Sequence, residues 1–434
     1  MPRAFVDPRD KPGDDKSARL MSPDPSAQAF DCGYAGMMTD TFTGSFTQQE
    51  PIPGDAIERA VEIMRSGRLH RYNTAPGETA ETALLEQEFA AYMGVDYCLA
   101  VTSGGYALTT ALRAFGLKAG EAVLTNGFTL APVPGAIAGA GGHPVLVEVT
   151  KDLVIDLDDL AAKIKSSRAR VLMLSHMRGH IADMDALTAI CDAASVAVIE
   201  DCAHTMGASW AGVKSGRHGL AACYSTQTYK HMNSGEGGFL ISGDAELMAR
   251  ATILSGSYML YGRHLASPPE EVFLKIRLET PNCSGRQDNL RAAILRPQLK
   301  LLDDNCRRWN AQYDAVASEL SDVPDVRLAH RPGAEQFVAS SFQFRVPDFS
   351  TGQIENLLKT TLARGVELKW FGAEKPMGFT SRHDSWTYAG NQSLPKTDQV
   401  LASLIDMRLP LTFSDADCHL IGRIIRECVL AAKH

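Results

Sequence analysis

A lysine ahead of a glycine-rich turn is the first place in this sequence where chemistry could occur. Lys230 lies in residues 223–238, just beyond an apolar run that predicts a strand. A lysine amine held in such a position can act as a nucleophile that forms a Schiff base with a carbonyl compound. Most lysines are solvated surface charges, so Lys230 becomes informative only together with partners elsewhere in the chain.

Three of these partners carry side chains suited to an aromatic phosphate ester. Asp201 follows the apolar run 196–200 and is expected at the carboxyl end of a buried strand. A carboxylate there can cap the next helix, or it can hold a pyridine nitrogen in its protonated, charged form. His204 is placed to reach a substituent of the same ring, and Ser225 offers a hydroxyl group to a phosphate.

The segment Ser103, Gly104, Gly105, Tyr106 joins a predicted strand to a predicted helix. Free N–H groups and the dipole at a helix start favour a bound phosphate, although a plain glycine turn explains the same residues. The chain has no GxGxxG and no GxxxxGK[ST] pattern, so neither a dinucleotide fingerprint nor a Walker loop accounts for this segment. A nucleophilic lysine, a carboxylate for a pyridinium and a phosphate site at a helix start are together what pyridoxal phosphate (PLP) requires.

The elements that must position these residues alternate between strands and helices. The apolar runs lie at 97–101, 122–125, 144–149, 170–174 and 196–200. Helical patterns separate them, which predicts right-handed crossovers and a mostly parallel sheet. Two further strands, 221–226 and 238–242, are too close in sequence for a crossover helix, so we expect them to run antiparallel. The prediction is an α/β fold with a mostly parallel seven-stranded sheet and helices on both faces.

The chain is expected to contain a tail and two domains. Residues 1–45 are polar, rich in Pro and Gly and without apolar period, which predicts a flexible N-terminal tail. Residues 46–300 would form the large domain that binds the cofactor. Residues 301–434 combine a long helical pattern, a strand near 340–346 and two more helices, which predicts a smaller C-terminal α+β domain.

Composition limits the possible partners. The formal net charge is -8 and no basic block is present, so we expect no nucleic-acid partner. No apolar run approaches the roughly 20 residues that span a bilayer, and the start lacks a signal-peptide pattern, so we expect no membrane segment and a cytoplasmic location.

The nine cysteines include no CxxC pair. His176 and His180 are not expected to lie on a helix, so no metal site is predicted.

Residues from about 52 to 434 resemble the sugar aminotransferases of the DegT/DnrJ/EryC1/StrS family, a branch of the fold-type I PLP enzymes. The matching stretches are 66–69, 103–108, 176–184, 200–204, Ser225 with Lys230, 235–238 and 286–294. They occur in the family's order and spacing. The resemblance implies the fold of type I PLP-dependent aminotransferases and a homodimer whose active sites draw residues from both chains.

The resemblance also implies a role for each matching residue. Lys230 would form the Schiff base with PLP, and Asp201 would bind its pyridine nitrogen. His204 would lie near the phenolic oxygen. The residues implied for the phosphate are Gly104, Gly105, Tyr106 and Ser225, and those implied for the substrate are Arg286, near the carboxylate of the amino donor, and Glu236.

Three positions depart from the family pattern. Gly105 stands where the family commonly has Thr, Ser284 where it commonly has Asn, and Leu130 where an aromatic side chain often stacks on the cofactor. Phe128 and Asn282 lie close in sequence and are candidates to compensate. We therefore include Phe128 among the expected cofactor-binding residues.

The activity implied is PLP-dependent transfer of an amino group from glutamate or glutamine to a keto-sugar, with a nucleotide-linked sugar as the expected acceptor. Three alternatives remain open at this point. One is a PLP-dependent sugar dehydratase, in which the family replaces the lysine by histidine; Lys230 argues against it, although His231 follows. The others are a keto-cyclitol aminotransferase and a catalytically inactive PLP-binding regulator of the same fold.

Overall fold

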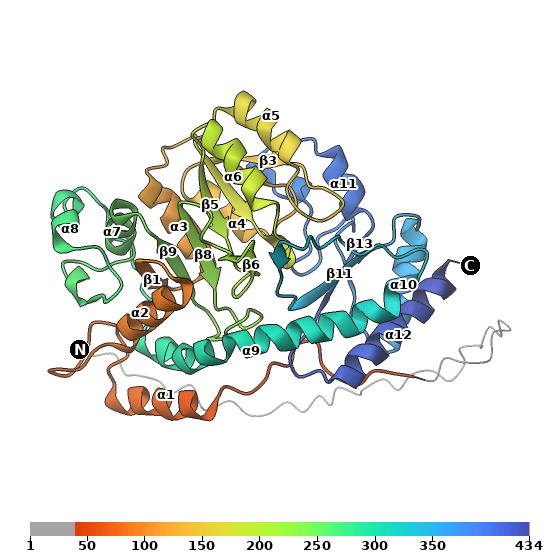
Figure 1. Ribbon diagram of the computed structural model, residues 1–434, viewed down its shortest axis with the longest axis horizontal. Coiled ribbons are helices and arrows are strands. Elements are labelled where there is room, and N and C mark those ends of the chain that lie inside the picture. Colours follow the sequence, from red (N-terminus) through yellow and green to blue (C-terminus); the bar gives the residue numbers. More distant parts are fainter. Residues whose placement is uncertain (1–39, 434) are drawn as a thin grey trace, which may run out of the picture. The chain divides into compact units, whose positions relative to one another are not determined.

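A seven-stranded sheet forms the centre of the fold in the computed structural model, which describes residues 40–433 (Figure 1). Its strands, in spatial order, are β1 (Tyr97–Val101), β9 (Gly238–Ser242), β8 (Ala221–Ser225), β5 (Ala197–Asp201), β4 (Val171–Ser175), β2 (Ala122–Asn126) and β3 (His143–Val147). β9 runs antiparallel to both of its neighbours, and the other pairs are parallel. The predicted sheet is confirmed, including the antiparallel pair formed by β8 and β9.

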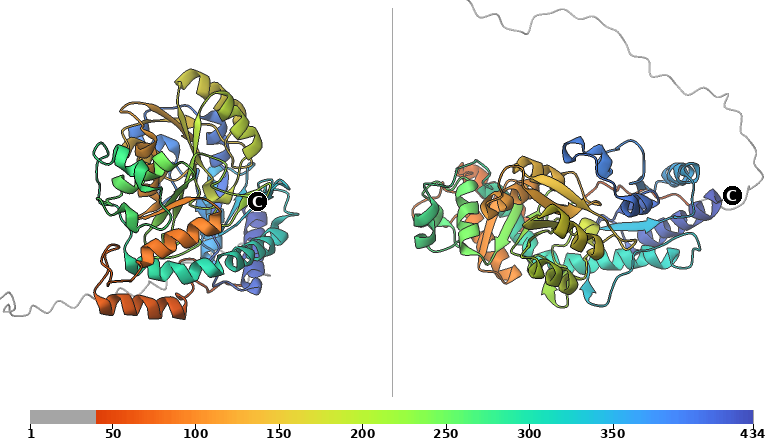
Figure 2. Two further views of the ribbon diagram at one scale, coloured as in Figure 1. Left: turned by 60° about the vertical axis from the view of Figure 1, so that its left-hand side comes forward. Right: turned by 90° about the horizontal axis from the view of Figure 1, so that it is seen from above.

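Helices cover both faces of this sheet (Figure 2). One face carries α3 (Gly104–Phe115), α4 (Pro132–Gly139) and α7 (Ala245–Leu254). The other carries α2 (Glu81–Met93), α5 (Leu157–Ser167), α6 (Met184–Ala193) and part of α9 (Asn289–Leu320). Successive strand residues serve opposite faces, because side chains alternate along a strand. In β1, Leu99 and Val101 pack on the first face, whereas Cys98 and Ala100 pack on the second.

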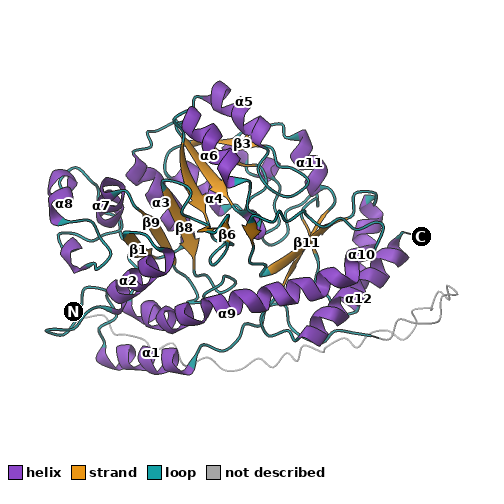
Figure 3. Ribbon diagram, viewed as in Figure 1, coloured by secondary structure: helices purple, strands orange, loops and turns teal. Residues whose placement is uncertain are grey.

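A smaller sheet of three antiparallel strands lies in the C-terminal part (Figure 3). It contains β11 (Ser341–Arg345), β13 (Leu404–Arg408) and β12 (Lys369–Trp370), in that order, and shares a core with α10 (Thr351–Ala363) and α12 (Asp415–Ala432). Ser350 and Ser414 start these two helices with capping boxes, in which the serine side chain accepts a hydrogen bond from a first-turn amide. The α+β character expected for this part of the chain is confirmed.

The remaining elements are short or peripheral. They are α1 (Gly54–Ser66), α8 (Glu270–Ile276), α11 (Pro395–Leu401), β6 (Ser209–Trp210), β7 (Val213–Lys214), β10 (Glu335–Gln336) and the 3-10 turns η1 (Met177–Gly179), η2 (Tyr261–Arg263), η3 (His383–Ser385) and η4 (Thr387–Ala389). Among residues 40–433, no helix has the length and apolar character needed to cross a membrane.

Helix α9 belongs to the cores of both sheets (Figure 1). It has 32 residues and is therefore about 48 Å long at 1.5 Å per residue. Leu295 and Leu299 pack beneath the large sheet, whereas Val316 and Leu320 pack against the small one. The expected domain boundary at residue 300 falls inside this helix, and the division into two domains stays a prediction.

Residues 40–46 are packed against the C-terminal part of the chain. Phe42 and Phe46 are buried, and their rings lie edge-on to Phe413 with centroids 4.9 and 5.0 Å away. The amide of Phe42 also donates a hydrogen bond to the carbonyl of Arg364. The expected flexible tail therefore ends earlier than residue 45, because two aromatic side chains fill the C-terminal core. Residues 1–39 of that tail lie outside the described residues.

Candidate active site

A cavity lies where the carboxyl ends of β4, β5 and β8 meet the start of α3. Of the side chains expected at the site, it brings together Gly104, Gly105, Asp201, His204, Ser225 and Lys230. Its apolar walls include Leu108, Leu130, Val133 and Met177. Ligands in open α/β sheets bind beyond the carboxyl ends of the strands, so this is the position that the fold favours for a site.

The amine of Lys230 lies against the imidazole of His204. The distance between Lys230 Nζ and His204 Nε2 is 2.6 Å, and His204 Nδ1 accepts a hydrogen bond of 3.3 Å from the backbone N–H of Arg178. Because Nδ1 accepts, a neutral imidazole carries its proton on Nε2 and must donate it to Lys230. Burial and the neighbouring charge of Lys230 hold the pKa of His204 well below its usual range. This arrangement requires the unprotonated amine at Lys230.

The pKa of Lys230 fits that requirement. Burial and, to a lesser degree, the charge of Arg178 lower this pKa to about 7, although the charge of Asp201 opposes them. A substantial fraction of the amine is therefore unprotonated at neutral pH. That is the nucleophilic form of a lysine side chain.

Asp201 is a buried carboxylate held by two donors. One oxygen accepts from the hydroxyl of Ser175 at 3.1 Å, and the other accepts from the amide of Ala203 at 3.1 Å. Ser175 in turn accepts from the hydroxyl of Thr129 at 2.7 Å. Burial raises the pKa of Asp201. A cation beside this carboxylate would favour its charged form, so the position suits a protonated ring nitrogen.

The first turn of α3 provides amides for an anion. Ser103 caps the helix by accepting from the amide of Tyr106 at 3.0 Å, so the Tyr106 amide expected to hold phosphate already has an acceptor. The amides of Gly104 and Gly105 precede it and have no acceptor within a helix. A Cβ at Gly104 would lie 2.8 Å from Cβ of Ser225, so glycine there lets the helix start approach the serine closely.

Four of the expected residues do not line the cavity: Tyr106, Phe128, Arg286 and Glu236. Phe128 is buried and meets Phe371 edge-on, with ring centroids 5.1 Å apart, while Leu130 occupies the cavity wall. Arg286 donates to the carbonyl of Gly256 at 2.8 Å. Glu236 is exposed in the turn after Lys230. The proposal that Phe128 replaces a stacking aromatic ring therefore has no support in its position, because its side chain belongs to the core.

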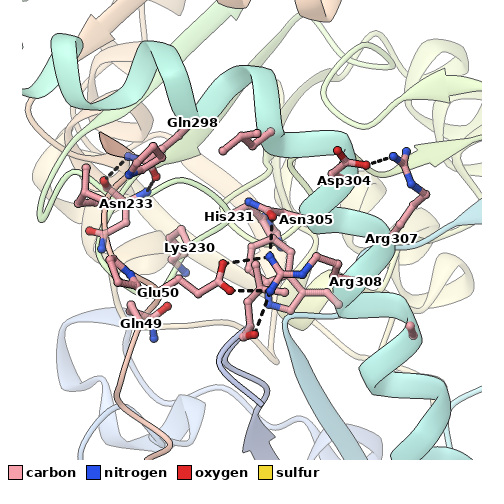
Figure 4. A pocket seen from close by; sticks show the side chains of 17 residues that line it. Gln49, Glu50, Lys230, His231, Asn233, Gln298, Asp304, Asn305, Arg307 and Arg308 are labelled. Carbon is pink, nitrogen blue, oxygen red and sulfur yellow. Dashed lines mark hydrogen bonds and ion pairs between the residues drawn. The ribbon is translucent and has the colours of Figure 1, made fainter. Parts of the chain in front are cut away.

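His231 does not line this cavity. It is buried, its ring lies 5.0 Å from that of Trp309, and it lines a second cavity of about 570 Å³ beside α9, which Lys230 also borders (Figure 4). That cavity is bounded by residues 49–53, and an ion pair of 2.5 Å joins Glu50 to Arg308 in its wall. His231 is thus not placed to replace Lys230, which removes the sequence argument for a dehydratase.

The histidines weighed as metal ligands have protein partners. His176 Nε2 lies 2.9 Å from Glu200, and His180 Nε2 lies 3.1 Å from Gln343. The ligand atoms of His176, Glu200 and Cys202 lie within 4.8 Å of one another. Glu200 nevertheless also accepts hydrogen bonds from the backbone amides of residues 216, 218 and 219. This carboxylate therefore ties a loop to the end of β5.

Sequence reasoning missed Ser175, Thr129 and Met177. Ser175 directly follows the apolar run 170–174, and the carboxyl ends of parallel strands meet at one edge of a sheet. That rule would have placed Ser175 beside Asp201. Thr129 lies in a loop and Met177 begins the short 3-10 turn η1, and the sequence pattern does not determine the paths of such segments.

Comparison with known proteins identifies the family that the sequence motifs suggest. Residues 52–426 match the model of the DegT/DnrJ/EryC1/StrS aminotransferase family. L-glutamine:2-deoxy-scyllo-inosose aminotransferase of Streptomyces fradiae is 32% identical over 63% of this chain, a match that spans just under two thirds, 65%, of its own length. L-glutamine:scyllo-inosose aminotransferase of Streptomyces griseus is 32% identical over 69% of this chain and 70% of its own.

A solved structure confirms the fold. The aminotransferase TlmJ from Streptoalloteichus hindustanus superposes with a TM-score of 0.75, covering 92% of this chain and 100% of TlmJ at 20% identity. Its likeness extends over the large sheet and the C-terminal part alike, since nearly the whole chain is covered. The fold, the cavity and the family match lead to one conclusion: the chain belongs to the DegT/DnrJ/EryC1/StrS aminotransferase family.

Proposed function

We propose that this protein is a PLP-dependent aminotransferase that takes an amino group from L-glutamine and transfers it to the keto group of a cyclitol. The observation that carries the proposal is the cavity in which the amine of Lys230 lies 2.6 Å from His204 beside the buried carboxylate of Asp201. No other group of described residues combines a lysine of lowered pKa with a buried acid and a helix start.

The residues of the cavity fit PLP. Asp201, a buried acid of raised pKa, gains a counter-ion if a protonated ring nitrogen binds beside it. The amides of Gly104 and Gly105, with Ser225, would hold the phosphate at the start of α3. Leu130 would contact the ring face. When bound, PLP supplies an electron-withdrawing ring that accepts the electrons released at the donor's α-carbon.

Lys230 would provide the nucleophile and the proton carrier. Its unprotonated amine can bond to a carbonyl carbon, and once released it can take a proton from the α-carbon of the donor. His204 donates a hydrogen bond to Lys230 Nζ and stays neutral, so it orients the amine without competing for that proton. Asp201 would hold a bound ring nitrogen in its protonated form by staying charged beside it.

The choice of substrates rests on the relatives. Two of them are named for L-glutamine as donor and for an inosose, a keto-cyclitol, as acceptor. We therefore favour the keto-cyclitol over the nucleotide-linked sugar that the family resemblance first suggested. Activity with scyllo-inosose but not with nucleotide-linked keto-sugars would support this choice, and the reverse result would overturn it.

We also propose that the enzyme is a homodimer. Arg286 does not line the cavity of its own chain, and the segment beside it exposes apolar side chains. These are Tyr258, Met259, Leu260, Leu265, Leu274 and Leu278, the last of which is 87% exposed. A second copy that covers this surface would bury the apolar side chains and bring Arg286 to the partner's site.

The absorption spectrum tests the cofactor assignment. We expect purified protein with PLP to show a visible band that fades when L-glutamine is added. Lys230→Ala should not show this response, whereas Lys359→Ala, which changes an exposed lysine on α10, should behave like the wild type. A protein that takes up no PLP would refute the cofactor, and a band that ignores every amino donor would favour the regulator.

A further inference from the structure

The last residues of three neighbouring strands meet beside the carboxylate of Asp201. β2, β4 and β5 end at Asn126, Ser175 and Asp201, and the register of β4 and β5 pairs Ser175 directly with Asp201. The side chain of Asn126 accepts from the amide of Ser175 and donates to its carbonyl, both at 3.0 Å. This pairing continues the ladder between β2 and β4, so the backbone of Ser175 is held on both sides.

Two hydroxyl groups form a directed chain that ends on this carboxylate. Ser175 Oγ donates to Asp201 Oδ2 at 3.1 Å, and Thr129 Oγ1 donates to Ser175 Oγ at 2.7 Å. A hydroxyl has a single proton, so Ser175 can only accept from Thr129 while its own proton points at Asp201. Thr129 is 1% and Ser175 4% exposed. We call these two side chains the hydroxyl chain.

The hydroxyl chain favours the charged form of Asp201. The other carboxylate oxygen, Oδ1, accepts from the amide of Ala203 at 3.1 Å, so each oxygen has one donor. If Oδ2 carried a proton, the proton of Ser175 would lose its acceptor, because the hydrogen bonds of residues 40–433 give it no other. Burial raises the pKa of Asp201, whereas the bonds from Ala203 and Ser175 lower it. Hydrogen bonds to a charge are stronger in such a buried place than in water.

This preference matters when a ring nitrogen shares a proton with Asp201. The proton can lie on the nitrogen, opposite a carboxylate, or on Asp201, opposite a neutral ring. Hydrogen bonds donated to Asp201 stabilise the first arrangement, because they are stronger to a carboxylate than to a carboxylic acid. The first arrangement also makes the ring the better acceptor of electrons.

We propose that Thr129 and Ser175 are positioning residues that keep Asp201 charged and so keep the proton on the ring nitrogen of bound PLP. The proposal rests on the proposed function. Ser175 holds Oδ2 directly, and Thr129 acts through Ser175 by fixing the direction of its proton. The substitutions that test the proposal leave unchanged the titratable groups around Asp201, which are Lys230, His176, His204, Cys202 and Cys223.

A titration of PLP-free protein tests the charge on Asp201 directly. Protein labelled with carbon-13 at the aspartate carboxyls is followed by NMR, and the signal of Asp201 is the one missing in Asp201→Asn. We expect Ser175→Ala to raise the pKa of Asp201 by about 1 to 2, because a hydrogen bond to a charged group is lost. Thr129→Val should raise this pKa by about 0.5, because Ser175 becomes a weaker donor, and Thr129→Ser should keep the wild-type value.

Two control variants remove buried hydroxyls elsewhere. Ser242 ends β9 beside the first residue of β8 and is 4% exposed, and Thr252 lies within α7 and is 2% exposed. Ser242→Ala and Thr252→Val should leave the pKa of Asp201 unchanged. Thermal melting checks folding, and Thr129→Val decides if Ser175→Ala does not fold. An unchanged pKa of Asp201 in Ser175→Ala or Thr129→Val, or an equal change in the controls, would overturn the proposal.

PLP labelled with nitrogen-15 in its ring reports where the shared proton lies. At pH 7.5 we expect the NMR signal of a protonated ring nitrogen in the wild type and in Thr129→Ser. In Ser175→Ala the signal should move toward that of an unprotonated ring, and no movement would overturn the proposal. If the wild type takes up no PLP, the proposed function fails, whereas the titration of PLP-free protein still decides whether the hydroxyl chain keeps Asp201 charged.

Discussion

Two neighbouring carboxylates at the end of β5 have opposite surroundings. Burial alone would raise the pKa of Glu200, but a hydrogen bond from His176 and the nearby imidazole of His218, 3.8 Å away, hold it well below the usual range. Asp201 has fewer donors, and burial raises its pKa. The negative charge on Glu200 therefore stabilises the folded state, whereas the negative charge on Asp201 destabilises it. The first carboxylate serves stability, and the second is poised for a cation that the fold does not supply.

Substitution of each carboxylate by its amide should separate these roles. Without PLP at pH 7.5, we expect Glu200→Gln to lose at least about 2 kcal/mol of unfolding free energy, because a buried N–H without an acceptor costs about 1–3 kcal/mol. Asp201→Asn should be as stable as the wild type or more stable, while losing its activity. Urea denaturation measures the unfolding free energy of each variant, and equal destabilisation of the two would contradict this difference between the carboxylates.

The pH dependence of these effects has opposite signs. Glu200, with a lowered pKa, stabilises the fold above the pKa of the unfolded chain and loses that effect as pH falls toward its folded value. Asp201, with a raised pKa, destabilises the fold as pH rises above the unfolded pKa. The advantage of Asp201→Asn over the wild type should therefore shrink as the pH is lowered below about 4.

Lys230 should react as a neutral amine near pH 7. A short pulse of acetic anhydride on PLP-free protein, followed by mass spectrometry of the Lys230 peptide, gives the fraction acetylated at each pH. We expect an inflection near pH 7, because burial lowers the pKa of Lys230 to about 7. Arg408→Gln should move the inflection upward, since it removes a nearby charge. An inflection above about pH 9 in the wild type would show an ordinary lysine.

At the scale of elements, the start of α3 contains two glycines that differ in the space available for a side chain. A Cβ at Gly104 would lie 2.8 Å from Cβ of Ser225, whereas the nearest atom to a Cβ at Gly105 is Cβ of Pro132, 3.9 Å away. Packing therefore requires glycine at residue 104 only. The space beside Gly105 remains open at the proposed phosphate site.

Alanine at these two positions should have different effects. We expect Gly104→Ala to lower stability by about 1–3 kcal/mol through overpacking and to weaken PLP binding. Gly105→Ala should be neutral or stabilising by up to about 1 kcal/mol, because it reduces the freedom of the unfolded chain without a clash. Melting temperatures and PLP titrations measure both effects. Equal losses in the two variants would refute the difference in packing.

The sequence predicted those elements and site residues that a regular alternation of strands and helices locates. Lys230, Asp201 and Ser225 lie at or just beyond strand ends, so the order of strands brings them together. Phe128 lies in a loop after β2, where no two-residue period tells which side chain reaches the cavity, so its role in cofactor binding stays a prediction. The grouping of Arg178, Lys369 and Arg408 around the ring of Phe379 was missed because they come from three elements, and sequence pattern does not give the distance between them.

At the scale of the whole molecule, a shared site makes a specific prediction about mixed dimers. Lys230→Ala and Arg286→Ala should each be inactive alone. Dimers reassembled from equal amounts of both should regain about a quarter of the wild-type activity, because half of them are mixed and each mixed dimer has one intact site. Sedimentation should show dimers for all variants. No recovery on mixing would show that Arg286 serves the site of its own chain.

Helix α9 links the two cores of the described chain, since it packs under the large sheet at one end and against the small sheet at the other. Near its start, Gln298 donates to the carbonyl of Asn233 and accepts from its amide, both at 2.8 Å, which fixes the loop after Lys230. Neither core can come apart without exposing part of the same helix. We therefore expect heat to unfold the two sheets in one cooperative calorimetric transition, with the central amides of α9 the last to exchange with deuterium.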